Sequence, residues 1–329
     1  MKIFIVGPKS IHTMGALVAK EAIVMGHTIY HFEDRSDNRF RNQFFRKIKY
    51  VFSKLRPGLS PRLKKLFFQN ILNFDPDLVI VISVNKMLPD IIQEAKQLCN
   101  AKFVAWYPDA IGGFFDQPVL ACDYDHIFVK CHDLVARLIA LGKNVTYLPE
   151  ACSPEYDKRV DIDPFYCCDV STAGSYYSYR IQMLSVLAGL DLNLYGISKD
   201  KYGEEKQLKS SLRQKDIFLV ERAKLYSSSK LIVNTLHPTE ANSMNVRLFE
   251  SVCSGTPVIT EYRPALDDLF VDGKEVISFR TKHELREKVE YFLSHPDEAK
   301  IIGVNGAKRA LKDHTYNNRI QQIIDIVMN

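Results

Sequence analysis

The sequence predicts an α/β protein of two successive doubly wound domains, each a parallel sheet between helices, facing each other across a cleft. Short apolar runs alternate with segments of helical spacing, which is typical of parallel sheets. The alternation stops in the polar stretch 157–165 and then begins again, and 329 residues fit two domains of about 100–200 residues each. With 46% hydrophobic and 25% charged residues, the composition excludes disordered, collagen-like and disulfide-stapled chains.

The first half opens with a strand–helix–strand unit. The apolar run 3–6 ends at Gly7, residues 12–25 have helical spacing, and 28–32 is a second apolar run. Further elements are expected as strands at 78–82, 102–106, 127–129 and 145–148 and as helices at 87–98 and 133–141. The first apolar run is too short for a signal peptide, and no run of about 18 apolar residues predicts a transmembrane helix.

The second half repeats the alternation. Strands are expected at 169–172, 193–195, 231–234, 258–260 and 276–279, and helices at 180–187, 221–226, 245–252, 282–293, 296–312 and 317–327. The predicted domains are residues 1–160 and 166–308, followed by a final helical segment, 309–329. Open parallel sheets bind ligands at the carboxyl ends of their strands, so the predicted cleft is the expected site.

Charge and cysteine content indicate the partners and the compartment. The net charge is only +5, yet eleven lysines and arginines lie between Arg35 and Lys65 against one acid, Asp37, with phenylalanines among them. Such a local basic patch favours an anionic surface or ligand over nucleic acid. The seven cysteines form no C-x-x-C pair, which is typical of reduced thiols in a cytoplasmic protein.

Three features of the first half carry candidate chemistry. The loop 7–10 joins a strand to a helix, where backbone N–H groups can approach an anion, although an ordinary turn explains it equally. His12 on that loop and Asp109, just past a strand, are candidate catalytic bases; the alternatives are an exposed histidine and a turn aspartate. Asp123 and Asp125 imitate a metal-binding D-x-D, but they immediately precede a strand, so we interpret them as turn residues and expect no metal.

The second half holds the predicted nucleotide site. Gly174 ends the first strand of the second sheet among hydroxyl side chains, and Arg180 follows, a combination that suits a diphosphate. Arg247 and Glu250 lie one helical turn apart, so a guanidinium for phosphate and a carboxylate for ribose hydroxyls could hold a nucleotide sugar; the alternative is a surface ion pair. The candidate nucleotide-binding residues are Gly174, Ser175, Arg180, Asn234, Asn245, Arg247 and Glu250.

These motifs resemble a known family. The segments 245–250, 254–258, 261–275 and 313–319 look like the group-1 glycosyltransferases with the GT-B fold, most closely the CgeB-like (spore-maturation-type) branch. The resemblance covers about residues 170–320, and 124–151 is similar too. It implies two Rossmann-like domains, a donor nucleotide in the second domain with Glu250 on its ribose, an acceptor in the first, and a final helix that crosses back to the first domain.

The stereochemistry of transfer stays open. Retaining enzymes of this fold often carry E-x7-E; Glu250 fits the second position, but Asn242 occupies the first. An inverting enzyme would need a base, for which His12 and Asp109 are the candidates, whereas a retaining enzyme would need none.

The sequence therefore predicts a metal-independent, cofactor-free glycosyltransferase that moves a sugar from a nucleotide-sugar donor to a glycan, lipid-linked or protein acceptor. A GT-B nucleotide-sugar epimerase and a non-catalytic nucleotide-sugar-binding protein are the alternatives. For the basic stretch three interpretations remain: an anionic membrane surface at the inner face of the cell membrane, an anionic soluble acceptor, or a solvated helix pair.

Overall fold

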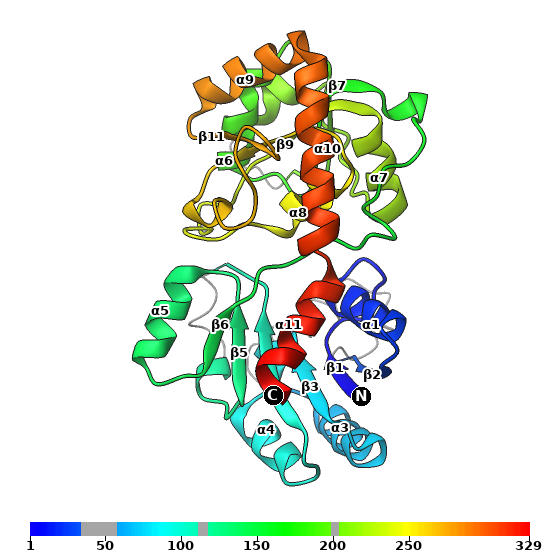
Figure 1. Ribbon diagram of the computed structural model, residues 1–329, viewed down its shortest axis with the longest axis vertical. Helices are drawn as coiled ribbons and strands as arrows, with labels where there is room; N and C mark the ends of the chain where they lie inside the picture. The colour runs from blue at the N-terminus through cyan, green and yellow to red at the C-terminus, as the bar shows by residue number, and fades with distance from the viewer. Residues whose placement is uncertain (34–57, 111–117, 199–203) are drawn as a thin grey trace. The chain divides into compact units, whose positions relative to one another are not determined.

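The structure, a computed structural model, describes residues 1–33, 58–110, 118–198 and 204–329. The chain divides into two compact units (Figure 1). Unit 1 comprises Met1–Leu148 and Arg319–Asn329, and unit 2 comprises Pro149–Asn318. The boundary thus follows Leu148, whereas the sequence places it near residue 160, and the last residues of the chain belong to the first unit.

Unit 1 is built on a six-stranded parallel sheet in the order β2-β1-β3-β4-β5-β6. Its strands are β1 (Lys2–Val6), β2 (Thr28–Phe32), β3 (Leu78–Val81), β4 (Lys102–Tyr107), β5 (His126–Val129) and β6 (Val145–Tyr147). Its helices are α1 (Met14–Val24), α3 (Pro61–Phe74), α4 (Pro89–Lys96) and α5 (His132–Ala140), with the 3-10 turns Val84–Lys86 and Pro118–Leu120; α11 (Tyr316–Met328) begins in unit 2 and continues into unit 1. The central strands are continuous apolar runs because helices cover both faces of a parallel sheet.

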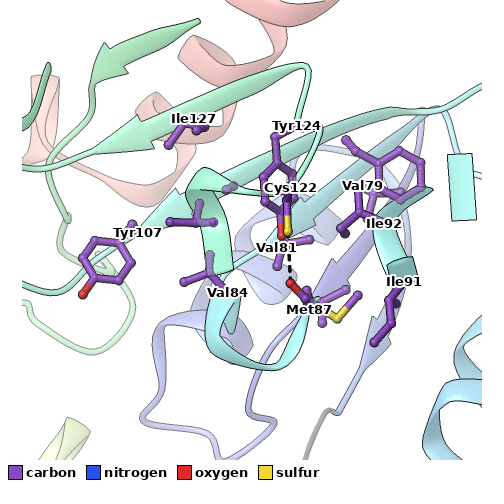
Figure 2. Close-up of a cluster of buried hydrophobic side chains, with 14 of the residues drawn as sticks. Val79, Val81, Val84, Met87, Ile91, Ile92, Tyr107, Cys122, Tyr124 and Ile127 are labelled. Carbon is purple, nitrogen blue, oxygen red and sulfur yellow. Dashed lines mark hydrogen bonds between the residues drawn. The ribbon is translucent and has the colours of Figure 1, made fainter. Parts of the chain in front are cut away.

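A hydrophobic cluster fixes the carboxyl ends of the central strands of unit 1 (Figure 2). Ile91 and Ile92 of α4 pack with Val81 of β3, and the Cys122 thiol donates a hydrogen bond of 3.2 Å to the carbonyl of Met87. Val84 and Tyr107, which follow β3 and end β4, belong to the same cluster. The segments that leave these two strands therefore start from a packed core.

Unit 2 has a five-stranded parallel sheet in the order β11-β10-β9-β7-β8. Its strands are β7 (Cys168–Ala173), β8 (Leu192–Tyr195), β9 (Ser229–Asn234), β10 (Val258–Glu261) and β11 (Ile277–Phe279). Its helices are α6 (Ser178–Leu184), α7 (Leu219–Ser227), α8 (Val246–Cys253), α9 (Lys282–Ser294) and α10 (Pro296–Asp313), with 3-10 turns at Pro164–Tyr166, Ser185–Leu187, Glu204–Leu208 and Pro264–Leu266. The predicted doubly wound α/β class is confirmed in both units.

Each sheet has one topological switch point. In unit 1, β1 lies between β2 and β3, and in unit 2, β7 lies between β8 and β9. The chain leaves β1 towards β2 on one side and leaves β3 towards β4 on the other, and β7 and β9 likewise lead to β8 and β10 on opposite sides. Such diverging connections open a crevice at the carboxyl ends of the strands. The crevices lie between β1 and β3 and between β7 and β9.

Only part of the basic stretch can be described. Residues 34–57, including the first of its two predicted helices, lie outside the described residues. The second helix is α3, which Ser60 caps by accepting a hydrogen bond from the Leu63 N–H group. Lys64 on α3 lies 2.7 Å from Asp90 and 2.8 Å from Glu94, so ion pairs within unit 1 already neutralise it. Of the helices in the described segments, none is long and apolar enough to cross a bilayer.

Candidate functional site

Two guanidinium groups meet at Gly174, the residue that follows β7 at the switch point of unit 2. A Cβ atom on Gly174 would lie 2.8 Å from Nε of Arg247 and 3.1 Å from Nη1 of Arg180. The backbone φ of Gly174 is +119°, which side-chain-bearing residues rarely adopt. Glycine is therefore required here both by the backbone conformation and by the approach of the two arginines.

Arg180, on α6, is the inner of the two cations and is fully buried. Its Nη1 donates to the Ser175 carbonyl at 3.0 Å, and its Nη2 donates to the Thr172 hydroxyl at 2.6 Å. The Nε group is buried without a partner, and no carboxylate of the described residues pairs with the side chain. Burial, followed by the charge of Arg247, lowers the pKa of Arg180 to about 10. Within the part of the chain that the structure describes, Arg180 is thus a buried positive charge without a carboxylate counter-ion.

Arg247 is the outer cation and is only partly buried. It lies in the first turn of α8, and its Nη1 donates to the side-chain oxygen of Asn234 at 3.4 Å and to the Thr235 carbonyl at 3.3 Å. Asn245 caps α8: its side-chain oxygen accepts from the Leu248 N–H group, and its amide donates to Thr235. Asn234 and Asn245 therefore position Arg247 and the helix that carries it.

The two arginines together favour an anion. Two like charges at one point repel each other, and burying a cation without a partner is costly. An anion bound at Gly174 would remove both penalties and would accept charge-assisted hydrogen bonds, which are about twice as strong as neutral ones. Of the predicted nucleotide-binding residues, the structure brings Gly174, Ser175, Arg180 and Arg247 to one point at the switch point of unit 2.

Glu250 has a different partner from the one that its spacing indicates. Its Oε1 lies 2.8 Å from Nη2 of Arg222 on α7, and the same Nη2 lies 2.8 Å from Oδ1 of Asp157. No ion pair with Arg247 is present, so the alternative of a surface pair between them is wrong. Burial raises the pKa of Glu250 to about 7, while the charge of Arg222 opposes that rise.

Two further buried carboxylates in unit 2 were not foreseen. Glu261, the last residue of β10, accepts hydrogen bonds from the Leu236 N–H group at 2.9 Å and the Tyr179 hydroxyl at 2.7 Å, and Arg263 lies 2.9 Å away. Glu240 is buried on the loop after β9 and accepts a hydrogen bond from Ser243. An acidic residue directly after an apolar strand was the available signal for Glu261, as it was for Asp109.

The switch point of unit 1 holds a pocket of about 220 Å³. Its lining residues come from the segments that follow β1, β3 and β4: Pro8, Met14, Gly15, Ile82, Ser83, Val84, Asn85, Tyr107, Pro108 and Asp109. Among the described residues of that lining, Asp109 has the only charged side chain, whereas the exposed His12 is not part of it. The structure therefore separates the two candidate bases: Asp109 lines the pocket and His12 lies outside its walls.

The D-x-D pair lies at the amino ends of β4 and β5, whereas the switch point of unit 1 is at the carboxyl ends of its strands. Nζ of Lys96 lies 3.3 Å from a carboxylate oxygen of Asp123 and 3.3 Å from one of Asp125. Asp125 also accepts a hydrogen bond of 2.7 Å from the Phe103 N–H group at the start of β4. These contacts agree with turn residues that join β4 to β5. The described residues contain no group of three histidine, cysteine or acidic side chains arranged to hold a metal ion.

We compared the sequence with protein-family models and with curated proteins. Residues 180–325 match a protein-family model described as glycosyl transferase-like. No curated protein matches the sequence.

Solved structures resemble the whole chain. Sucrose-phosphate synthase from Thermosynechococcus elongatus is 12% identical with a TM-score of 0.70 over 99% of this chain and 98% of that one. Anabaena HepE in complex with UDP and glucose is 12% identical with a TM-score of 0.66 over 100% and 99%. WaaG, a glycosyltransferase involved in lipopolysaccharide biosynthesis, is 11% identical with a TM-score of 0.60 over 100% of both chains.

At such identities the structural likeness establishes the fold, which is GT-B. The family match covers the part of unit 2 that carries Arg180, Arg247 and Glu250. The chain thus has the GT-B fold, and residues 180–325, less than half of its length, resemble glycosyl transferases. The narrower CgeB-like branch stays a prediction from the sequence.

Proposed function

We propose that this protein transfers a sugar from a nucleotide-sugar donor bound by unit 2 to an acceptor hydroxyl held by unit 1. The observation that carries the proposal is the meeting of Arg180 and Arg247 at Gly174, at the switch point of the sheet. Nucleotides bind at switch points in doubly wound sheets, and two guanidinium groups suit a diphosphate. The similar HepE structure contains UDP-glucose, which supports a donor of this class.

The chemistry follows from where charge develops. When the bond between the sugar and the diphosphate breaks, negative charge grows on the departing phosphate oxygens. Arg247, which is partly exposed, would contact those oxygens, and the buried Arg180 would add its charge from behind. Because hydrogen bonds within the protein hold both groups, they need little reorganisation during the reaction. We propose that these cations take the part that a metal ion has in other transferases.

The acceptor side is argued from the pocket in unit 1. The pocket, of about 220 Å³, would hold one small ring such as a terminal sugar. Ser83 and Asn85 offer hydrogen bonds, and the Asp109 carboxylate would orient a hydroxyl or accept its proton. The acceptor is a glycan, a lipid-linked sugar or a protein. A membrane-bound acceptor would fit the basic stretch, most of which lies outside the described residues.

Replacing Arg247 tests the diphosphate site. A thermal-shift panel of UDP, GDP, dTDP, ADP and CMP first identifies the base, since a ligand that binds only the folded state raises the melting temperature. Arg247→Ala should then lose about 10–100-fold in affinity for the preferred diphosphate, the loss typical of a charged hydrogen bond, and much less for the nucleoside alone.

The matched control is Arg159→Ala, which removes an exposed arginine of the same unit that has no ion-pair partner in the described chain. It should bind like the wild type. Equal losses of diphosphate and nucleoside affinity in Arg247→Ala would mean that Arg247 is structural, and the proposal would fail.

A further inference from the structure

A chain of buried ionic contacts leads from the start of unit 2 to Glu250. The Ser153 N–H group donates to Oδ2 of Asp157 at 2.8 Å, and Oδ1 of Asp157 lies 2.8 Å from Nη2 of Arg222. That same Nη2 lies 2.8 Å from Oε1 of Glu250. The side chains of Asp157, Arg222 and Glu250 are 3%, 10% and 8% exposed. One guanidinium nitrogen thus connects two carboxylates that come from different segments of the unit.

The contact to Arg222 occupies only one oxygen of Glu250. Oε1 faces the guanidinium, whereas Oε2 has no hydrogen-bond or ion-pair partner in the described part of the chain. Oε2 is also absent from the polar atoms that are sealed from solvent without a partner. Glu250 therefore presents one unoccupied acceptor oxygen, and Arg222 fixes the side-chain rotamer that presents it.

Electrostatics give Arg222 a second effect on Glu250. Burial and the neighbouring charge of Asp157 both raise the pKa of Glu250, and the charge of Arg222 is the largest influence that lowers it. Arg247 lowers it further. The charged and titratable groups that interact with Glu250 are Asp157, Arg222, Tyr226, Arg247 and Tyr316. Without Arg222, the buried carboxyl group would become neutral at a higher pH.

We propose that Arg222 is a positioning residue for nucleotide recognition: its contact with Oε1 orients Glu250 and so presents Oε2 to the ribose hydroxyls of the donor. Asp157 anchors Arg222 from the other side. This inference rests on the proposed function, in which unit 2 binds the nucleotide. It assigns an indirect role in that binding to two residues that touch no ligand.

The experiment measures discrimination between a ribose and its 2′,3′-dideoxy analogue. The probes are the preferred diphosphate of the five-nucleotide panel and its dideoxy form, and their dissociation constants are compared between pH 5.5 and 8.5. In the wild type the ribose form should bind about 10-fold or more tightly, as expected for hydrogen bonds to a carboxylate. The discrimination ratio, which is the dissociation constant of the dideoxy form divided by that of the ribose form, should fall as the pH drops below the pKa of about 7 of Glu250.

Arg222→Met and Asp157→Asn should shift the pH range of ribose discrimination in opposite directions. Arg222→Met should reduce the ratio to within about twofold near neutral pH, and discrimination should reappear only at higher pH, whereas Arg222→Lys should restore part of it. Asp157→Asn should extend discrimination to lower pH, because Asp157 raises the pKa of Glu250. If the ion pairs of Arg222 served only stability, these variants would lower the melting temperature without changing the discrimination ratio.

The matched control is Lys224→Met, which removes another cation of α7 whose ion pair, 3.1 Å from Asp163, is more exposed. Its discrimination ratio should equal that of the wild type. Wild-type discrimination at every pH in Arg222→Met, or in Asp157→Asn if the former does not fold, would overturn the inference. A wild type without ribose preference would also overturn it, while the loss of diphosphate affinity in Arg247→Ala would still support the proposed function.

Discussion

The two units carry the same type of sheet, yet their switch points differ in charge. In unit 1 the described residues that line the crevice between β1 and β3 are apolar or uncharged polar residues and one exposed carboxylate, Asp109. In unit 2 the crevice between β7 and β9 ends at two guanidinium groups, Arg180 and Arg247, neither of which forms an ion pair with a carboxylate of the described residues. Strand order thus determines where each site lies, and the side chains at the strand ends determine which ligand it takes.

The difference also concerns preorganisation. Arg180 is held by hydrogen bonds to Ser175 and Thr172 and is fully buried, so its charge acts from a fixed position. Asp109 is exposed at the end of a segment that follows β4. A buried fixed charge suits tight binding of one group present in every donor. An exposed carboxylate suits proton transfer to varied acceptors.

The largest expected effect concerns the carboxylate of unit 1. Asp109→Asn keeps the shape of the pocket but removes the proposed base, so the rate of sugar transfer should fall by about 10²–10⁴-fold, the usual contribution of general base catalysis. Donor affinity, which belongs to unit 2, should stay unchanged. The release of nucleoside diphosphate from the donor in the presence of acceptor measures the rate.

Asp123→Asn is the control, because Asp123 is an exposed aspartate of the same unit that pairs with Lys96 away from the pocket. A wild-type rate in Asp109→Asn would show that Asp109 only completes a turn. That result would favour a retaining mechanism, which needs no such base.

The next largest effect is expected at the switch point of unit 2, when Gly174 is replaced. Gly174→Ala places a Cβ atom against Arg247 and Arg180 at a φ of +119°, so it should lower diphosphate affinity about 10-fold or more and cost about 1–3 kcal/mol of stability. Gly189→Ala has similar backbone strain at φ +93° but meets no atom within 4 Å. It should lose stability and keep its affinity. Equal affinities of the two variants would place the diphosphate elsewhere.

The alternation of strands and helices was predictable because it depends on local patterns. Apolar runs and helical spacing are properties of neighbouring residues, and the predicted strands 3–6, 78–82 and 231–234 correspond to β1, β3 and β9. Gly174 and Arg180 were also accessible to sequence reasoning, because a glycine at a strand end followed by a helix is itself a local signal.

The partner of Glu250 was not predictable from spacing. Arg222 on α7 and Asp157 in the first loop of unit 2 are distant from Glu250 in the sequence, and only the folded unit brings the three side chains together. One signal was present: Arg222 shares a helical face with Leu225 and Tyr226, both buried. A cation on an apolar face indicates a buried partner, but the sequence does not say which one.

A smaller effect should appear in the pH dependence of stability. Because the folded protein raises the pKa of Glu250 from 4.5 to about 7, the stabilisation is complete below pH 4.5 and is lost as the pH rises through 7. Glu250→Gln, which cannot ionise, should therefore be more stable than the wild type at pH 8, by on the order of 1–3 kcal/mol, and the gain should shrink towards pH 5. Denaturant unfolding at each pH measures it.

Glu287→Gln is the control, since Glu287 is an exposed glutamate of unit 2 outside the ion pairs of the described chain. Its stability relative to the wild type should not depend on pH in this way. A constant difference between Glu250→Gln and the wild type from pH 5 to 8 would contradict the assignment of the raised pKa to Glu250.

The smallest expected effect is that of chelation. If Arg180 and Arg247 neutralise the departing diphosphate, sugar transfer should proceed at an unchanged rate in EDTA, because charge compensation comes from the chain itself. Lys96 pairs with both Asp123 and Asp125 and offsets part of their charge, which makes that pair a weaker competitor for a cation. Activity that disappears in EDTA and returns with Mn²⁺ or Mg²⁺ would mean that the two guanidinium groups do not suffice. Sugar transfer would then require a metal ion at the donor diphosphate in addition to the two arginines of unit 2. Asp123 and Asp125 would be the first residues to replace in a search for its ligands.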